Sequence, residues 1–201
     1  METDRKAHYS QPEIVAFYAT AAAEVGLWRS EERLLPSLFA PEAVLLNVGA
    51  GAGRVSFGLW ELGYHQVLGV DFARPMVEEA RLLASKLEYA TPFRVGDVSR
   101  LGFDAGAFDG VIWTAAGIAD LAGPEARATA MKELRRVAKS GGLALITTPL
   151  PADESMDAFA ALLASTGWEV TRTAARAAVA DEPDDVTRRY PDVTFWVLKA
   201  V

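Results

Sequence analysis

The sequence predicts an α/β fold, a doubly wound and mainly parallel sheet with helices on both faces. Short apolar runs alternate with longer amphipathic segments along most of the 201 residues, which is the pattern of strands alternating with helices. The first strongly apolar run leads directly into glycines at 49, 51 and 53 and then into a helical pattern. A chain of this length forms one ordinary domain, so we expect a single domain over residues 1–201.

Two helices are expected before the first strand. Apolar residues at helical spacing predict them within residues 8–39. The first helix begins with Ser10 as its cap and ends at Gly26, because serine favours N-caps and glycine favours helix ends. The second helix is expected from about Ser30 to Phe39.

A buried strand and a glycine turn are expected over residues 43–54. Five of the six residues from 43 to 48 are apolar, as in a strand of a parallel sheet that is buried on both faces. The glycines that follow permit a tight turn and let a ligand approach the backbone closely. A helix then continues to Gly63, and its first turn offers unpaired N–H groups. Strand, glycine turn and helix together predict a cradle for a nucleotide cofactor.

The next apolar run ends in an acidic residue, Asp71. A carboxylate at the tip of the second strand is suited to ribose hydroxyls. The glycine spacing, however, differs from the dinucleotide fingerprint G-x-G-x-x-G, which needs a glycine where this chain has Arg54. The spacing therefore disfavours a nicotinamide dinucleotide.

The remaining segments continue the alternation. Helices are expected at 75–87, 124–139 and 153–165, the last capped by Asp153, and strands at 93–96, 108–114, 143–148, 168–174 and 193–199. Residues 175–192 join the last two strands. If strand six is parallel to the central strands and strand seven antiparallel, this connection lies at the edge of the sheet where ligands bind. It is then either a functional loop or an acidic loop without a role.

The G-x-G-x-G turn followed by Asp71 resembles the class I S-adenosylmethionine-dependent methyltransferases. Matching stretches run from about residue 43 to 149, and Ser140 replaces the family's proline before strand five. The resemblance implies a Rossmann-like, seven-stranded mixed sheet in the order 3-2-1-4-5-7-6 with strand 7 antiparallel. It also implies that residues 1–40 form a helical lid over a core at 41–201.

The resemblance further implies S-adenosylmethionine as the cofactor and S-adenosylhomocysteine as the product. In this family the second-strand acid holds the ribose, a Met-like residue flanks the adenine, and the third-strand acid accepts from the adenine amino group. The matching cofactor-binding residues are Asn47, Gly49, Ala50, Gly51, Gly53, Asp71, Phe72, Met76, Asp97, Val98, Trp113 and Thr114. The candidates for the acceptor site and the lid wall are Tyr9, Tyr18, Trp28 and Ala115.

Several of these assignments have a structural alternative. Met76 also suits plain core packing, Asp97 suits a cap on the turn after the third strand, and Trp113 suits the interior of the sheet. The three lid aromatics are equally ordinary as core residues, because aromatic side chains supply much of a core's area.

Composition limits the function classes. The chain has no cysteine and two histidines, so disulfides, cysteine–zinc sites and a cysteine nucleophile are excluded, and we expect no metal site. A net charge of −7 and a pI near 4.9 disfavour a large nucleic-acid footprint. No apolar run approaches the ~20 residues of a membrane helix, so we expect a cytoplasmic protein.

We therefore expect a methyltransferase that acts on a small-molecule acceptor, with a protein acceptor as an open alternative. Because the methyl donor carries its own activation, no catalytic residue is required and none is assigned. One departure from the family is Asn47, where an acid is usual. It leaves open a non-catalytic module that only binds S-adenosylmethionine, and an NAD-dependent oxidoreductase is a further alternative.

Overall fold

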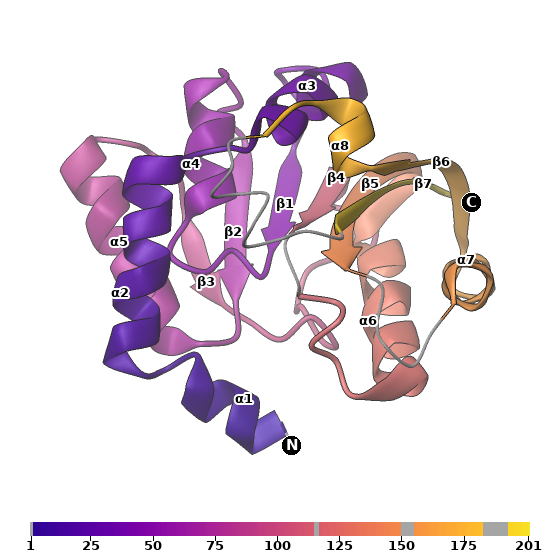
Figure 1. Ribbon diagram of the computed structural model, residues 1–201, viewed down its shortest axis with the longest axis horizontal. Helices are drawn as coiled ribbons and strands as arrows, with labels where there is room; N and C mark the ends of the chain where they lie inside the picture. Colours follow the sequence, from indigo (N-terminus) through magenta and orange to yellow (C-terminus); the bar gives the residue numbers. More distant parts are fainter. Residues whose placement is uncertain (1, 115–116, 150–154, 183–192) are drawn as a thin grey trace.

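A seven-stranded sheet forms the centre of the molecule (Figure 1). The computed structural model describes residues 2–114, 117–149, 155–182 and 193–201. The strands are β1 (Leu45–Val48), β2 (Val67–Asp71), β3 (Phe93–Val95), β4 (Phe108–Trp113), β5 (Ala138–Pro149), β6 (Trp168–Ala175) and β7 (Val193–Ala200).

The sheet has the order β3-β2-β1-β4-β5-β7-β6. Strands β1 to β5 pair in parallel, whereas β7 is antiparallel to both β5 and β6. Strand β6 therefore runs in the same direction as β1. The predicted fold, strand order and single antiparallel strand are confirmed.

Helices surround the sheet in the described parts of the chain (Figure 1). They are α1 (Glu2–His8), α2 (Pro12–Thr20), a π-helical turn η1 (Ala21–Val25), α3 (Arg29–Leu38), α4 (Arg54–Glu61), α5 (Arg74–Leu87), α6 (Gly123–Val137), α7 (Met156–Ser165) and α8 (Arg176–Val179).

Alternate residues of the central strands face two different apolar clusters. Leu46 of β1 packs in a cluster that contains Leu134 of α6 and Phe159 of α7. Its neighbour Leu45 packs in another, with Leu35 of α3 among its members. Both faces of the sheet are thus covered, because side chains of a strand point alternately to either side. This explains why the first strand reads as an almost unbroken apolar run.

The N-terminal helices differ from the prediction in their boundaries. The N-cap of α2 is Gln11, not Ser10, whose hydroxyl donates to the Lys6 carbonyl at 2.6 Å. Pro12 takes the first helical position and holds the preceding residue in an extended conformation, so the cap moves one residue along. The predicted end at Gly26 is found, with φ +63°.

Two boundaries in the second half also differ. Strand β5 begins at Ala138 instead of residue 143, because Ala138 already pairs with Phe108 before a register shift. Helix α7 begins at Met156, and the Ser155 hydroxyl accepts from the Ala158 N–H at 3.2 Å as its cap. The predicted cap Asp153 lies outside the described residues.

Candidate functional site

The glycine turn brings bare backbone to the carboxyl ends of the strands. Gly51 has φ +54° and Gly53 has φ +106°, both in the left-handed region where a side chain is strained. A Cβ on Gly51 would lie 3.5 Å from the Tyr18 ring, and one on Gly53 only 2.7 Å from the Phe57 ring. The turn therefore packs closely against side chains and keeps one backbone surface open to a cavity.

Asp71 ties this turn to the second strand. One carboxylate oxygen accepts from the Gly51 N–H at 2.9 Å, and the other accepts from the Ala73 N–H at 2.9 Å. Asp71 is 6 % exposed. Burial raises the pKa of this carboxyl, and backbone N–H groups of Ala73, Gly51 and Phe72 oppose that rise. Since each oxygen has two lone pairs, both can still accept a ligand hydroxyl.

A cavity lies beside Asp71 and the turn. The residues that line it come from α1 and the turn after it, from α2 and α5, from the ends of β1, β2 and β4, and from the segments that follow β1 to β4. They are Arg5, Tyr9, Tyr18, Val48, Gly49, Gly51, Val70, Asp71, Phe72, Met76, Gly96, Asp97, Val98, Trp113, Thr114, Gly117, Asp120 and Leu121. This is the edge at which ligands bind in doubly wound folds.

The N-terminal helix is fastened across one side of the cavity. The Tyr9 hydroxyl donates to the Asp120 carboxylate at 2.6 Å, and the Arg5 guanidinium donates to the Asp120 carbonyl at 3.0 Å. The Tyr9 ring also lies edge-on to Phe72, with centroids 5.7 Å apart. Burial, and next the bond to Asp120, raise the pKa of Tyr9 well above its ordinary value, so the hydroxyl keeps its proton.

Asp97 has both a local role and a place in the cavity. Its Oδ1 accepts from the Ser99 N–H at 2.8 Å and from the Ser99 hydroxyl at 2.7 Å. This is the turn cap considered as an alternative. Asp97 nevertheless lines the cavity together with Val98, so the two interpretations are compatible.

Most of the predicted site residues line this cavity, but four described ones do not. Ala50 and Gly53 lie within the turn, away from the cavity lining. Asn47 is 1 % exposed, and its amide donates to the Ser56 hydroxyl at 2.9 Å beneath α4. Trp28 is buried elsewhere, against Val193. Ala115 lies outside the described residues.

The sequence interpretation missed Arg5 and Asp120, which also line the cavity. Arg5 precedes the expected first helix, and no pattern marked α1. Asp120 has a weak signal, because it follows the tip of the fourth strand and such segments meet at the ligand edge.

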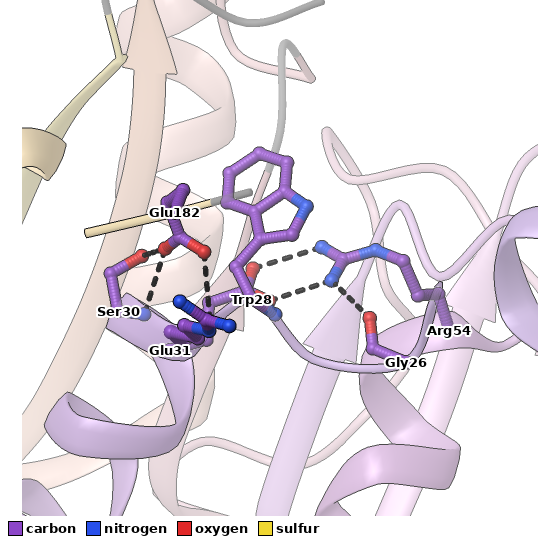
Figure 2. A network of polar contacts seen from close by, with 7 residues as sticks. Gly26, Trp28, Ser30, Glu31, Arg54 and Glu182 are labelled. Carbon is purple, nitrogen blue, oxygen red and sulfur yellow. Dashed lines mark hydrogen bonds and ion pairs between the residues drawn. The ribbon is translucent and has the colours of Figure 1, made fainter. Parts of the chain in front are cut away.

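A second polar network fixes the start of α4, directly after the glycine turn (Figure 2). Arg54 donates to both carboxylate oxygens of Glu31, at 2.6 and 2.9 Å, and to the Gly26 carbonyl at 2.8 Å. Glu31 also accepts from the Trp28 N–H at 2.8 Å. Glu31 is fully buried, so this two-point pair compensates a charge that would be costly alone.

The connection after β6 reaches the same network. The Glu182 carboxylate accepts from the backbone N–H groups of Arg29 and Ser30, at 3.0 and 2.8 Å, and from the Ser30 hydroxyl (Figure 2). Glu182 thus satisfies unpaired N–H groups in the first turn of α3. The part of 175–192 that the structure describes has a definite structural role.

Comparison with known families shows what part of this chain is similar to. A family model described as a methyltransferase domain matches residues 45–142, the stretch that contains the glycine turn, Asp71 and the tip of β4. Residues 45–142 of this chain are thus similar to a methyltransferase domain.

Solved structures share the fold of this chain. An S-adenosylmethionine-dependent methyltransferase from Methanosarcina mazei is 17 % identical, with a TM-score of 0.72, over 88 % of this chain and 99 % of that one. A TehB-like S-adenosylmethionine-dependent methyltransferase from Corynebacterium glutamicum is 21 % identical, with a TM-score of 0.73, over 95 % and 100 %.

A third solved structure with this fold is the [4+2]-cyclase SpnF, for which no methyl transfer is named. It is 16 % identical, with a TM-score of 0.66, over 85 % of this chain and 78 % of that one. At such identities the likeness concerns the fold alone, and activity has to be argued from the site.

The cavity has features that suit S-adenosylmethionine, the cofactor that the resemblance implies. Gly51 leaves space that a Cβ would fill, and the oxygens of Asp71 retain lone pairs for hydroxyl donors. No described helix has the length and apolar character needed to span a membrane. The described residues also contain no group of three or more His, Asp or Glu side chains that could hold a metal ion.

Proposed function

We propose that this protein binds S-adenosylmethionine in the cavity beside Asp71 and transfers its methyl group to a small-molecule acceptor. The observation that carries the proposal is the bond between the Asp71 carboxylate and the Gly51 N–H at 2.9 Å. It places an acid suited to ribose and a bare backbone suited to close approach at the same cavity.

Each end of the cavity is suited to one part of the cofactor. Asp71 would accept from the ribose hydroxyls, and Asp97 with the Val98 N–H would meet the adenine edge. Met76 and Phe72, which line the same cavity, would flank the adenine ring. Thr114 and Trp113 at the tip of β4 would border the donor and the acceptor, since β1 and β4 flank the point where the winding of the sheet reverses.

When bound, the sulfonium supplies an electrophilic methyl group that moves in one displacement, with the carbon–sulfur bond breaking as the bond to the acceptor atom forms. The chain's own contribution is to hold the acceptor in line and to exclude water. Positioning of this kind contributes as much as ~7–11 kcal/mol. Helix α1 with Tyr9 directly after it, and helix α2 with Tyr18, would act as the lid that excludes water.

A small acceptor suits the charge of the chain. A net charge of −7 opposes a nucleic-acid footprint, because phosphate backbones need clustered cations. The cavity is also closed on one side by α1, which leaves room for a small molecule at the tip of β4 more readily than for a macromolecule.

The proposal is tested first by binding and then by turnover. We expect S-adenosylhomocysteine, but not NAD, to raise the melting temperature, because a ligand that binds only the native state stabilises it. Incubation with S-adenosylmethionine and pools of metabolites, read by mass spectrometry, should then show an acceptor that has gained one methyl group.

Three results would contradict parts of this proposal. Stabilisation by NAD alone would support the oxidoreductase alternative. Binding of S-adenosylhomocysteine without any methylated product across small-molecule pools would support the binding-only module. Methylation confined to protein fractions would replace the small acceptor by a protein one.

A further inference from the structure

Two guanidinium groups pack against the buried indole ring of Trp28. Arg54 lies 4.8 Å and Arg176 lies 5.4 Å from the centre of this ring. Trp28 and Arg176 are each 3 % exposed. Two cations are therefore held close to one aromatic side chain in a region removed from solvent, where charge has to be compensated.

The charge of Arg54 is compensated by the chain itself. Its guanidinium makes a two-point pair with the buried Glu31 and a third bond to the Gly26 carbonyl (Figure 2). The Glu31 carboxylate thus compensates the charge of Arg54.

Arg176 has no such compensation in the described parts of the chain. Its Nη1 is buried without a hydrogen-bond partner, and no described carboxylate forms an ion pair with it. Glu182 follows α8 by a few residues. Its carboxylate already accepts hydrogen bonds from the first turn of α3. A buried cation without a counter-charge is strongly unfavourable, so a bound anion would be stabilised beside Arg176.

Arg176 lies at the edge of the sheet that also holds the cavity. It follows directly after β6, which runs in the same direction as β1, so it leaves the sheet at the edge that holds the cofactor cavity. Strands β5 and β7 lie between β6 and β4, and Thr147 of β5 is fully buried. Thr147 follows Ile146, the partner of Trp113, and therefore lies beside Thr114, which lines the cavity.

We propose that Arg176 binds a carboxylate group of the methyl acceptor, with the Trp28 ring beside it, so that the acceptor is a small organic acid. This rests on the proposed function. A guanidinium matches a carboxylate with two parallel N–H···O bonds, and the apolar surface of Trp28 and Val193 suits the carbon skeleton of the acid. Because the whole protein is acidic, only a local cation such as Arg176 can attract an anionic acceptor.

Access requires only a local movement. Arg176 begins the four-residue helix α8 at the end of β6, and β6 is the outermost strand on its side of the sheet. Local opening is least costly at such edges, so an acceptor can reach the guanidinium without unfolding of the core.

The test uses three ligands of nearly the same shape that differ in charge: benzoate, benzamide and benzylamine. They are titrated against the full-length protein saturated with S-adenosylhomocysteine, and the melting temperature is measured. We expect a concentration-dependent rise with benzoate and none with the neutral or cationic analogue. The Arg176→Met variant should lose this rise and still bind S-adenosylhomocysteine.

Arg172→Met is the matched control, because it removes an exposed arginine of β6, the strand that directly precedes Arg176. It should keep the full response to benzoate. If Arg176→Met does not fold, the wild-type series decides by itself, and Arg176→Lys, which keeps the charge but loses the planar fork, should weaken the response.

The proposal is overturned if benzoate gives no more stabilisation than benzamide in the wild type, or if Arg176→Met responds as the wild type does. Its failure is distinguishable from that of the proposed function, because S-adenosylhomocysteine binding is measured first. Absence of that binding would remove both, whereas binding without a benzoate effect removes only the organic-acid acceptor. An acceptor from the metabolite pools that carries no acidic group would likewise refute it.

Discussion

The Asp71 carboxylate accepts a hydrogen bond from the Gly51 N–H at 2.9 Å, so the tip of the second strand is bonded to the turn that follows the first. A second bond, from the Ala73 N–H, holds the other oxygen. The acid is thereby oriented before any ligand arrives, and orientation of this kind lowers the cost of binding.

Replacement of Asp71 by asparagine should weaken cofactor binding. The amide nitrogen would face a backbone donor and could accept nothing from ribose, so we expect the dissociation constant of S-adenosylhomocysteine to rise about 10- to 100-fold. Titration calorimetry measures this. Asp104→Asn, at an exposed position, is the control and should bind normally. An unchanged constant for Asp71→Asn would show that the ribose lies elsewhere.

The pH dependence of stability should carry the signature of Asp71. Burial raises the pKa of this carboxyl in the folded state, so between the ordinary value near 4 and the raised value the folded chain holds a proton that the unfolded chain has lost. This group's contribution to the free energy of unfolding therefore decreases as pH rises through that window. Urea unfolding at several pH values should show a smaller decrease for Asp71→Asn than for the wild type; equal slopes would argue against a raised pKa.

Breaking the pair between Arg54 and Glu31 should destabilise the fold. Arg54→Met leaves the fully buried Glu31 without its counter-charge, and we expect a loss of about 3–5 kcal/mol in the free energy of unfolding. Combining Arg54→Met with Glu31→Met should recover much of it. The exposed pair of Arg74 and Glu78, whose side chains are 70 % and 61 % exposed, is the control, and its loss should change stability little.

Loss of the Tyr9 hydroxyl should loosen the side of the cavity that α1 covers. Tyr9→Phe removes the 2.6 Å bond to Asp120 and keeps the ring on Phe72, so we expect release of S-adenosylhomocysteine to become about 2- to 10-fold faster. Stopped-flow fluorescence can follow this release. Tyr89→Phe removes a comparable bond, to Glu61 at 2.7 Å, away from the cavity. Equal rates for the two variants would mean that α1 does not restrain the cofactor.

Alanine substitutions at Gly51 and Gly63 should distinguish backbone strain from obstruction of the cavity. Gly51→Ala and Gly63→Ala both place alanine at positive φ, +54° and +91°, which costs roughly 1–2 kcal/mol each. A Cβ at Gly63 meets nothing within 4 Å, whereas one at Gly51 meets Tyr18 at 3.5 Å and borders the cavity. Both variants should lose similar stability, but only Gly51→Ala should also lose affinity for S-adenosylhomocysteine.

The features that the sequence predicted are those encoded locally. The apolar run at β1, the glycines after it and the acid at the end of β2 are each legible within a few residues, because buried parallel strands and tight turns need those residue types. The order of strands followed from the resemblance that these motifs carry. The local sequence also showed Arg54 at the position where dinucleotide-binding folds need a glycine.

The features that it did not predict depend on contacts between distant residues. Arg5 and Asp120 are 115 positions apart and meet only once the fold is formed. The buried Glu31 reads in the sequence as one acid among several, and its partner Arg54 lies 23 positions away. The N-cap of α2 at Gln11 was predictable from Pro12, because proline favours the first helical position. This preference outweighs the preference of Ser10 for an N-cap.

Glu182 completes the first turn of α3, although 152 positions separate it from Ser30. During synthesis on the ribosome, α3 emerges long before its cap exists, and it can gain this bond only when nearly the whole chain has been made. The N–H groups at the start of α3 therefore have to be satisfied by water until residue 182 has been made.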